Sequence, residues 1–460
     1  MKRTRWFIAL FATMAMVLAA CGDGEGGDET TTTAAGGDEV ECESAGADFN
    51  LFGAPTGVEG QALQGFIDVY NEVCDTNITF RGSDGFEQEL RIAVDGGDPP
   101  AVAFTPQPAS ICEFADDGHL VSMEDMGFDI AQMEENHSAY WVGLGECDDG
   151  NHYGIPWFPN FKSIVFYHIP IFEDGGYEIP ETYDDLVALS EQMVADGQTP
   201  WCMGFESGEA TGWPGTDWIE DIFVRIHGAD AYQQWYEHEI PFNDPMVAEA
   251  FDTFGEIMFG EGFVLGGAEN VAGVNFGDSP GPLFSDPPGC AMLKQGSFIS
   301  NFFVDQPGYE EGDEENIGVF SFPTIDGNTG AMGGGDTILV FDDSPEVAAA
   351  IADWISPEWQ CTLASASGGG VAPHGGHGVA GVERLPGHKD VDPNCYETDA
   401  STTFAETITD ALAANTFVFD ASDLMPPEVG QRTFWDGIVE WTRGADTQTV
   451  LDTIEASWPG

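Results

Sequence analysis

Residues 48–104 read DFNLFGAPTGVEGQALQGFIDVYNEVCDTNITFRGSDGFEQELRIAVDGGDPPAVAF. In this stretch, short runs of apolar and β-branched residues alternate with segments whose apolar side chains recur at the helical period. The expected strands are 48–52, 78–80 and 101–104, and the expected helices are 63–73 and 86–94. Because strands alternate with helices, we predict a wound α/β unit, and ligands of such units bind at the loops that follow the strands.

The alternation continues beyond residue 154 and predicts a second α/β unit. Further strands are expected at 163–167, 317–320 and 337–341, and further helices at 182–193, 216–226, 344–354, 404–413, 429–441 and 450–458. Thr182 and Asp185 form a capping pattern at the start of one helix, and Pro345 stands at a first helical position, where proline is favoured. Glycine and proline make 260–289 an irregular segment.

The N-terminus has the composition of an export signal. Three basic residues among the first five precede an apolar run at 6–20 that is shorter than a membrane span. The sequence Leu-Ala-Ala-Cys at 18–21 resembles a bacterial lipobox, so we expect a signal peptide at 1–20, a lipid on Cys21 and a disordered tether at 21–45. The alternative is a signal peptide that ends in Ala-x-Ala, with Cys21 as a chance neighbour.

Eight cysteines remain after Cys21, an even number that suits an oxidising compartment. No Cys-x-x-Cys pair is present, so a zinc site is not expected. Eight cysteines allow about 105 connectivities, and the sequence leaves them open. The simplest choice joins nearest neighbours, because each bridge then closes a local excursion of the chain. The predicted pairs are Cys42 with Cys74, Cys112 with Cys147, Cys202 with Cys290, and Cys361 with Cys395.

The charge balance is strongly acidic. The 460 residues include 81 Asp and Glu but only 12 Lys and Arg, which gives a formal net charge of -69. A surface of this sign repels nucleic acid, so a nucleic-acid partner is excluded. Solubility is the simple explanation; adaptation to concentrated salt is the one we favour, because about 1 M salt screens the self-repulsion.

Motifs of common enzymes are incomplete in this chain. Gly277 to Gly281 matches Gly-x-Ser-x-Gly as a string, but Pro280 lacks the backbone N–H that an oxyanion hole requires. Phe161 precedes Lys162 where a phosphate-binding loop needs glycine, so this chain is not an ATPase. His374 and His377 could hold a metal, but a glycine-rich loop without other ligands is the commoner case. We therefore expect no catalytic residue, no cofactor and no metal.

Two tryptophan-rich stretches, 201–208 and 211–218, carry the most informative side chains. Trp213 stands between glycine and proline, with Glu206 and Asp217 nearby in sequence. A sugar ring packs its C–H face on an indole and hydrogen-bonds its hydroxyls to carboxylates and amides, so these residues predict a carbohydrate site. The same chemistry recurs at Trp157 with Asn160 and Lys162, and at Arg432 with Trp435. On an extended segment, Trp157 would face away from Asn160 and Lys162, so only one of the two sets can face a ligand.

Four stretches carry a resemblance to a known family: Tyr153 to Pro156, residues 199–220, Asp286 to Cys290, and Met332 to Asp336. With the lipobox, the tether and the α/β pattern, they resemble extracellular solute-binding lipoproteins of ABC importers, in the sugar-binding family and its α-glucoside-binding branch. The resemblance runs from about residue 46 to the end of the chain. The acidity and the histidine-bearing insertion around 374–388 depart from it.

This resemblance implies an α/β, two-lobed, type II periplasmic-binding-protein-like fold, with hinge strands between the lobes and a sugar in the cleft. We expect residues 46–156 plus 324–366 in lobe 1 and 157–323 plus 367–460 in lobe 2. The implied contacts are Glu59, Phe104 and Gln107 from the first lobe, Asn160, Glu206, Trp213, Asp217 and Trp218 from the second, and Asp336 and Trp435.

The expected function is non-catalytic binding of an α-glucoside or a related oligosaccharide. The implied partners are ABC permease subunits with their ATPase, and the membrane is reached through the lipid anchor on the extracellular face of the cytoplasmic membrane. A monomer is expected. Two alternatives remain open: a secreted glycoside hydrolase of a salt-adapted bacterium, which also needs aromatic and carboxylate side chains in a cleft, and a surface adhesin.

Overall fold

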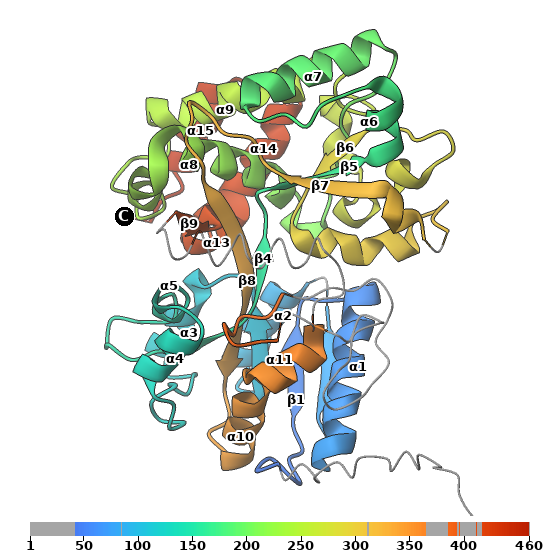
Figure 1. Ribbon diagram of the computed structural model, residues 1–460. Coiled ribbons are helices and arrows are strands. Elements are labelled where there is room, and N and C mark those ends of the chain that lie inside the picture. The colour runs from blue at the N-terminus through green and yellow to red at the C-terminus, as the bar shows by residue number, and fades with distance from the viewer. Residues whose placement is uncertain are drawn as a thin grey trace, which may run out of the picture. The chain divides into compact units, whose positions relative to one another are not determined.

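The computed structural model describes residues 42–83, 85–310, 312–364, 385–392, 395, 411 and 416–459. Residues 41–460 form one compact unit, in which two α/β lobes are joined by strands β4 (Gly154–Phe161) and β8 (Ala331–Val340) (Figure 1). The predicted signal peptide, the predicted lipidation site Cys21, nearly all of the predicted tether, the predicted helix at 404–413 and the His374/His377 loop lie outside the described residues, Ala411 excepted.

The first lobe is built on a sheet with the strand order β2-β1-β3-β8-β4. Its first three strands are β1 (Asn50–Gly53), β2 (Thr79–Gly82) and β3 (Val102–Thr105). β1 pairs with both neighbours in parallel, whereas β8 runs antiparallel to β3 and β4. The parallel pairs follow from the helical crossovers α1 (Gly57–Cys74) and α2 (Phe86–Asp95), as the sequence predicts.

Alternation along these strands divides the core of the first lobe into two layers. Leu51, Phe104 and Ile338 point to a cluster that includes α1, α10 (Pro345–Trp354) and α11 (Pro357–Ala364). Phe52 and Ala103 point to the opposite cluster, with α2 and α3 (Ala109–Asp116). Two short helices, α4 (Ile130–Asn136) and α5 (Ala139–Gly143), complete this lobe. The sheet is therefore covered on both faces, and polar side chains can gather only at its ends.

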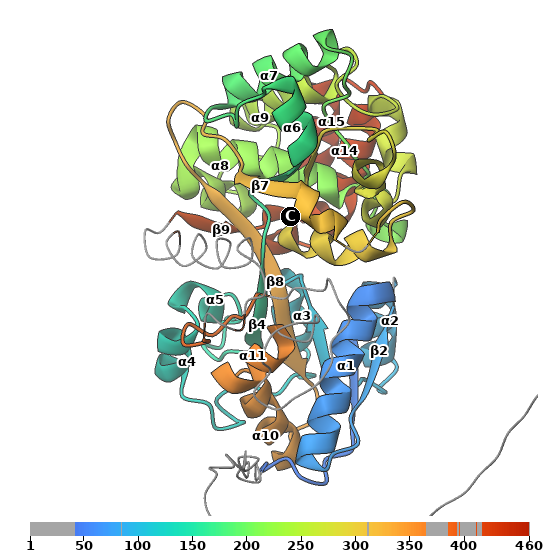
Figure 2. The same cartoon turned by 45° about the vertical axis from the view of Figure 1, so that its right-hand side comes forward.

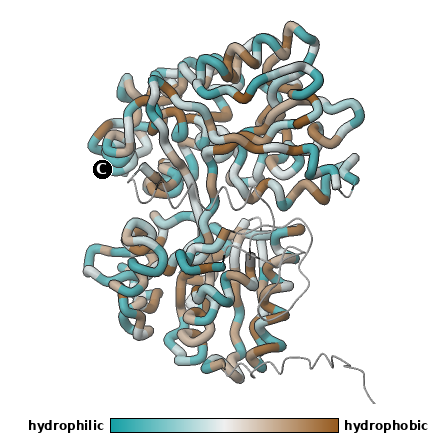
Figure 3. The backbone as a smooth tube through the Cα atoms, viewed as in Figure 1, coloured by the Kyte–Doolittle hydropathy of each residue, from teal (hydrophilic) through white to brown (hydrophobic). Residues whose placement is uncertain are grey.

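The second lobe holds the sheet β6-β5-β7, in which β5 (Ile164–His168) pairs antiparallel with β6 (Met292–Lys294) and β7 (Ile317–Ser321). Its helices pack around this sheet and alternate in polarity along their length (Figure 3). They are α6 (Ile169–Gly175), α7 (Tyr183–Ala195), α8 (Trp213–Tyr236), α9 (Pro245–Met258), α13 (Ala421–Leu424), α14 (Trp435–Thr442) and α15 (Thr447–Glu455). Short 3₁₀ helices are η1 (Gly208–Ala210), η2 (Ala268–Gly273), η3 (Phe276–Asp278), η4 (Gly281–Phe284), η5 (Ser297–Asp305) and η6 (Asp313–Asn316). A π-helical turn, η9 (Val429–Phe434), precedes α14.

Strands β4 and β8 pass from one core to the other, as Figure 2 shows from a second angle. On β8, Met332 packs in the core of the second lobe and Ile338 in that of the first. The short strand β9 (Phe417–Phe419) pairs in parallel with the start of β8. The sequence predicted only 337–341 as a strand here. Its glycine-rich beginning was missed because strand propensity is low for glycine.

Close packing explains the glycines of β8. A Cβ on Gly335 would lie 2.5 Å from the Trp141 ring, and one on Gly333 would lie 2.5 Å from the Asn160 carbonyl oxygen. Both distances are shorter than real contacts of a Cβ. Glycine at these positions lets the backbone of β8 pass close to Trp141 and to β4 where the strand crosses between the lobes.

Most helix predictions hold with shifted ends. The capping box of Thr182 and Asp185 is present at the start of α7, and Pro345 starts α10. Helix α8 is longer than predicted, starting at Trp213, and it contains Gly228 at φ 83°, where the helix kinks. The predicted helix at 429–441 is a π-helical turn followed by α14.

The eight cysteines pair as predicted from their order in the chain. The bridges are Cys42–Cys74, Cys112–Cys147, Cys202–Cys290 and Cys361–Cys395, with Cα–Cα distances of 5.2, 5.4, 5.5 and 5.2 Å. These distances lie in the usual range for disulfides. Within the described residues, no helix is both long and apolar enough to span a membrane.

Candidate functional site

A buried lysine lies where three elements of the second lobe meet. Lys162 directly follows β4, and its Nζ is 2.9 Å from Oδ1 of Asp217 on α8 and 2.5 Å from Oδ2 of Asp420 after β9. All three side chains are buried. The ammonium therefore joins the end of a crossing strand to the starts of two helices. We call these three residues the Lys162 cluster.

Local hydrogen bonds fix Asp420 in this position. Its Oδ1 accepts the backbone N–H of Asp423 at 3.1 Å and so caps α13. The Oε atoms of Glu220, on α8, accept the backbone N–H groups of Ala421 at 2.8 Å and Ser422 at 3.2 Å. The N-terminus of α13 is thus held by one carboxylate of its own and one from α8.

The Lys162 cluster separates the pKa values of its two carboxyl groups. Burial raises the pKa of Asp217 to about 7, although Lys162 opposes the shift. For Asp420, burial acts in the same direction, but the ammonium and hydrogen bonds outweigh it and lower its pKa to about 2. Burial would lower the pKa of Lys162, yet Asp217 and Asp420 raise it well above its usual value. Lys162 is therefore a permanent cation whose charge is already matched.

Trp213 lies beside this cluster. Its ring is half-buried, contacts Phe276 and Phe298, and has the Lys162 ammonium 5.2 Å from its centroid. The preceding Gly212 has φ 121°, and a Cβ there would lie 2.3 Å from the Trp435 carbonyl oxygen. Glycine thus permits the close approach that sets Trp213 next to Trp435 in space. The Lys162 ammonium also lies 2.9 Å from Asp217 Oδ1, so it lies close to both Trp213 and Asp217.

Glu206 is held as a half-buried acceptor near the loop before Trp213. Its Oε2 accepts from Asn275 Nδ2 at 2.7 Å, and its Oε1 accepts from the Gly208 N–H at 2.8 Å. These hydrogen bonds lower the pKa of Glu206. The side chain is therefore a fixed carboxylate.

The first lobe contributes Glu87, on α2, and Gln107, after β3. Thr105 Oγ1 donates to Gln107 Oε1 at 2.9 Å and holds its amide. Burial raises the pKa of Glu87, and the carboxylate of Glu209, in the second lobe, adds to the shift. Asp423, on α13, also interacts electrostatically with Glu87. We call Glu87, Gln107, Trp213, Asp217, Asp420 and Asp423 the interlobe site.

A second contact between the lobes involves Glu59, on α1. Its Oε1 accepts a hydrogen bond from Asn301 Nδ2, on η5, at 3.3 Å. Val58 and Ala62, on the same helix, pack with Val304 of η5. Glu59, predicted as a ligand contact, is thus engaged across the two lobes.

Three of the predicted ligand contacts lie in the cores. Phe104 and Trp157 are fully buried in the first lobe, with the Trp157 ring stacked on Trp354 at 5.7 Å. Trp218 is buried in the second lobe, stacked on Phe254 at 4.8 Å. The prediction of direct contact is corrected for these three residues, because their rings have neighbours in place of an exposed face.

The expected alternation along β4 also fails. A register shift between Pro156 and Phe158 breaks the two-residue period, and both Trp157 and Phe158 enter the same core. Asn160 remains half-buried on this strand. The strand therefore does not divide into one ligand face and one core face.

The other predicted residues vary in exposure. Asp336 is buried on β8, opposite Phe158 in the register, and Trp435 is buried at the start of α14. Among the described residues, the buried Nε1 atom of Trp435 donates no hydrogen bond and the buried Oδ2 atom of Asp217 accepts none. Arg432 is exposed on η9.

Glu87, Glu220, Asp420 and Asp423 were missed in the sequence. The Asp-x-x-Asp spacing at 420–423 after an apolar run is a capping signal that could have located the start of α13. Among 81 acidic residues, however, a single carboxylate carries little information.

A second buried charge network lies deeper in the same lobe. Asp221 pairs with Arg225 and, at 3.3 Å, with Lys294. Ser163 Oγ donates to Asp221 Oδ1 at 2.6 Å and accepts from the Met332 N–H at 2.8 Å. This network ties α8 to the first residues after β4 and to β8, so its role is structural.

Asp217, Glu220 and Asp420 place their carboxylate oxygens within 4.8 Å of one another, a spacing that a metal ion could bridge. The Lys162 ammonium already supplies the positive charge there. The group of Cys42, Cys74 and Asp353 has the same spacing, but its cysteines form a disulfide.

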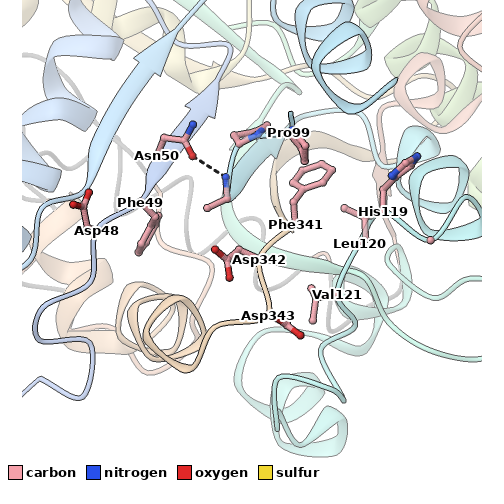
Figure 4. Close-up of a pocket in the computed structure, with 13 residues that line it drawn as sticks. Asp48, Phe49, Asn50, Pro99, His119, Leu120, Val121, Phe341, Asp342 and Asp343 are labelled. Carbon is pink, nitrogen blue, oxygen red and sulfur yellow. Dashed lines mark hydrogen bonds between the residues drawn. The ribbon is translucent and has the colours of Figure 1, made fainter. Parts of the chain in front are cut away.

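Two pockets lie away from the interlobe site. One of about 620 Å³ opens at the start of β1 and β3 and the end of β8, beside Asn50, His119 and Asp342 (Figure 4). This is the opposite end of the sheet from Gln107. The other, of about 510 Å³, lies near the crossing strands beside Phe161, Arg225 and Phe322. Neither contains Trp213 or Asp217.

Comparison with known proteins points to one family. Residues 54–356 match the family model of bacterial extracellular solute-binding proteins. The osmoprotective compounds-binding protein GgtB of Synechocystis sp. is 35% identical over 411 residues, 89% of this chain and 92% of that protein. The alpha-glucosides-binding periplasmic protein AglE of Rhizobium meliloti is 33% identical over 429 residues, 90% of this chain and 87% of that protein.

Solved structures give the same fold at lower identity. The bacterial solute receptor AcbH, described as preferring β-D-galactopyranose, superposes with a TM-score of 0.72 at 17% identity, over 90% of this chain and 98% of that one. The two-lobed arrangement predicted from the sequence is therefore that of periplasmic sugar-binding proteins.

Proposed function

Because this chain belongs to the family of bacterial extracellular solute-binding proteins, we propose that it is a lipid-anchored component of an ABC importer that binds an α-glucoside. The family binds solutes without converting them, so the protein is not an enzyme. Membership of the family supports sugar binding for an ABC importer. The α-glucoside and the lipid anchor are our proposals.

One observation carries the ligand class. The half-buried Trp213 ring lies among oriented acceptors, with the Lys162 cluster on one side and Glu206 fixed by two hydrogen bonds nearby. An indole face beside carboxylate and amide groups suits a pyranose ring and its hydroxyls. AglE, whose name gives α-glucosides as its ligands, matches over 90% of the chain.

We assign the ligand contacts to predicted polar and aromatic residues outside the hydrophobic cores, with the remaining predicted residues in support. The contacts are Gln107, Asn160, Glu206, Trp213, Asp217, Asp336, Arg432 and Trp435; Glu59 acts between the lobes, Lys162 orients the two aspartates, and Phe104, Trp157 and Trp218 support the site from the cores. The unsatisfied Oδ2 of Asp217 and Nε1 of Trp435 are an acceptor and a donor for sugar hydroxyls.

The proposed lobes are 46–156 plus 324–366 and 157–323 plus 367–460. The two largest hydrophobic clusters support this division, although the first residues of β8 pack with the second lobe. A third cluster joins Trp141 of the first lobe to Phe417 and Phe419 of the second. Bending at the crossing strands would close the lobes on the sugar, and the ligand stabilises the closed state by its differential affinity. Cys21 would hold a monomer at the extracellular face of the cytoplasmic membrane, where it delivers sugar to the permease subunits.

A narrower ligand is an osmoprotective glucoside. The name of GgtB gives osmoprotective compounds as its ligands, and 81 acidic against 12 basic residues suit a protein that works in concentrated salt. A cell in concentrated salt would use such a solute to balance the osmotic pressure of its surroundings.

Calorimetric titration of the pure protein with maltose, trehalose and sucrose tests the proposal. Micromolar affinity, about 8 kcal/mol, is expected for at least one of them, with a shift in tryptophan fluorescence and no release of glucose. Release of glucose would support the hydrolase. Absence of saturable binding to all three would support the adhesin and remove the proposal.

A further inference from the structure

Asn275, in the loop before η3, lies directly beside Glu206 although 69 residues separate the two in the chain. Their backbones form a short parallel bridge. The Glu206 N–H donates to the Val274 carbonyl at 2.9 Å, and the Phe276 N–H donates to the Glu206 carbonyl at 2.9 Å. A Cβ at Gly204 would lie 2.7 Å from the Asn275 carbonyl oxygen, so glycine permits this close approach. The backbone therefore fixes the place from which the Asn275 side chain starts.

The orientation of the Asn275 amide is also set by the backbone. Its Oδ1 accepts the Gly277 N–H at 2.9 Å and caps η3. Because an N–H can only donate, the other end of the amide, Nδ2, faces Glu206, whose Oε2 lies 2.7 Å away. Gln306 Nε2 donates to the Gly277 carbonyl at 2.7 Å and holds the same turn. The donor to Glu206 is thus oriented by contacts in which Glu206 takes no part.

Glu206 keeps part of its capacity to accept hydrogen bonds. A carboxylate has about four lone-pair positions, and Asn275 and the Gly208 N–H occupy one on each oxygen, at 2.7 and 2.8 Å. The side chain is half-buried, so a ligand can reach the others. The hydrogen bond from Asn275 is the main cause that lowers the pKa of Glu206, which supports an ionised acceptor.

The same segment also supports the indole of the site. The ring of Phe276, next to Asn275 in the chain, has its centroid 5.2 Å from that of Trp213 and meets it edge to face. Phe302, on η5, lies 5.4 Å from Phe276. Two consecutive residues therefore set the carboxylate of Glu206 and the indole of Trp213 relative to each other. A sugar ring that packs on the indole while its hydroxyl donates to the carboxylate needs this relative position.

We infer that Asn275 is a positioning residue of the sugar site, which holds the Glu206 carboxylate in the orientation that accepts a ligand hydroxyl. The inference rests on the proposed function, in which Glu206 is a ligand contact. Both polar ends of the Asn275 amide are already engaged, so the residue acts through Glu206. Without this donor, the carboxylate is free to rotate, and binding has to order it at a cost in affinity.

Asn275→Asp separates positioning from the structural role of the residue. Aspartate caps a helix as well as asparagine does, so this variant keeps the bond to the Gly277 N–H and loses only the donor to Glu206. At about pH 8 the two carboxylates are ionised and repel each other, whereas at about pH 5 they can share a proton that restores the hydrogen bond, because adjacent carboxylates raise the pKa of one of them.

Calorimetric titration of the whole protein with maltose, trehalose and sucrose measures the effect at both pH values. We expect the dissociation constant of Asn275→Asp, divided by that of the unmodified protein, to be about tenfold at pH 8 and about twofold at pH 5. Other titratable groups near Glu206 are Glu209 on η1, Asp278 on η3 and Asp217, whose pKa is about 7. They are the same in both proteins, so they affect both dissociation constants alike.

A double-variant cycle tests whether Asn275 acts through Glu206. Glu206→Gln should weaken binding about tenfold and Asn275→Ala about fivefold, but Asn275→Ala added to Glu206→Gln should cost less than about a further twofold.

Asn243→Asp is the matched control. Asn243 Nδ2 donates to Asp452 Oδ1 at 2.9 Å, so the substitution sets two carboxylates against each other in a pair that includes no proposed ligand contact. Its ratio of dissociation constants should stay near one at both pH values. Circular dichroism verifies folding of each variant.

The possible failures are distinct. If the unmodified protein binds none of the sugars, the proposed function is wrong and the inference falls with it. If a sugar binds and Glu206→Gln binds it equally well, sugar binding stands and the inference is overturned. If the ratio for Asn275→Asp does not change with pH, or if the effects of Asn275→Ala and Glu206→Gln add in full, Asn275 does not act through Glu206 and the inference is overturned.

Discussion

At the level of single residues, the Lys162 cluster stabilises the fold and orients the two aspartates of the proposed ligand site. Its ammonium is buried between Asp217 and Asp420. Removal of one partner from a buried ion pair leaves an uncompensated charge, which is far more costly than loss of a surface pair.

Replacement of Lys162→Met should lower the free energy of unfolding by about 3 to 5 kcal/mol, because it leaves Asp217 and Asp420 buried without a cation. Urea denaturation followed by circular dichroism measures the change. Arg443→Met is the matched control, since its pair with Glu440 is exposed, and it should change the free energy by less than about 1 kcal/mol. Equal effects of the two substitutions would contradict the structural role of Lys162.

Asp217 should make stability depend on pH. Its pKa is about 7 in the folded protein, against about 3.9 when unfolded. The folded state therefore holds this proton more tightly, so the stabilising contribution is complete below about pH 4 and is lost as the pH rises through about 7, at up to ~1.4 kcal/mol per pH unit. The low pKa of Asp420, about 2, acts below this window.

Urea denaturation between about pH 4.5 and about pH 7.5 measures this slope, and Asp217→Asn should flatten it because the amide does not titrate. Glu191→Gln, at an exposed position, should retain the slope of the unmodified protein. A slope that persists unchanged in Asp217→Asn would assign the titration to another group.

For the ligand, Trp213→Ala and Trp435→Ala should each weaken sugar binding by at least about tenfold, because each removes an indole from the site. Trp213 is half-buried on the interlobe site, so its loss should leave the fold intact. Calorimetric titration gives the affinity, and thermal unfolding is the control. Unaltered affinity in both variants would place the sugar elsewhere.

Sequence analysis identified part of this site but also assigned to it residues that lie in the hydrophobic cores. Trp213, Asp217 and Glu206 are close in the chain, and the structure keeps them together. Trp157 and Trp218 share the same residue type but lie in cores, since an aromatic residue on a strand or helix does not reveal which face it occupies. Glu220 and Asp420 come from distant segments, and only the fold brings their carboxylate oxygens within 4.8 Å of each other.

At the level of elements, α1 and η5 form a contact between the lobes. Glu59 accepts a hydrogen bond from Asn301, and Val58 and Ala62 pack against Val304. Val304→Asp should disfavour the closed state, because it places a charge against buried apolar side chains. We expect sugar affinity to fall by about fivefold and the radius of gyration in the presence of sugar, from small-angle scattering, to increase.

Ile92→Asp is the control for Val304→Asp, since it introduces the same charge at an apolar residue that is exposed on α2. It should change neither the affinity nor the radius of gyration. If Val304→Asp behaves like this control, the contact between α1 and η5 does not contribute to closure.

Element prediction succeeded where the hydrophobic period was clear. The βαβ pattern of 48–104 and the capping box of α7 appear in the structure as expected. The start of β8 was not predicted, because its three consecutive glycines have low strand propensity. The predicted alternation of side chains along β4 was wrong, because a register shift interrupts it. Both are crossing strands, whose shape is determined by partners far away in the sequence.

At the level of the whole molecule, the charge of -69 should make stability depend strongly on salt. Screening weakens repulsion among the carboxylates as the Debye length falls from about 10 Å at 0.1 M to about 3 Å at 1 M. We expect the unfolding temperature to increase steeply with NaCl over this range, measured by calorimetry. A flat response would leave solubility as the explanation of the acidity.

The close contacts of β8 have a consequence for variation of the sequence. If the codons of Gly333, Gly334 and Gly335 were randomised and clones selected for sugar uptake, recovery should be almost restricted to glycine at 333 and 335, where a methyl group already meets backbone or an indole. Position 334 should be more permissive, since a Cβ there would lie 3.3 Å from its nearest neighbour, Lys162 Cε, against 2.5 Å at 333 and 335. The narrowest mutational tolerance of the protein would thus be found in residues that never touch the transported molecule.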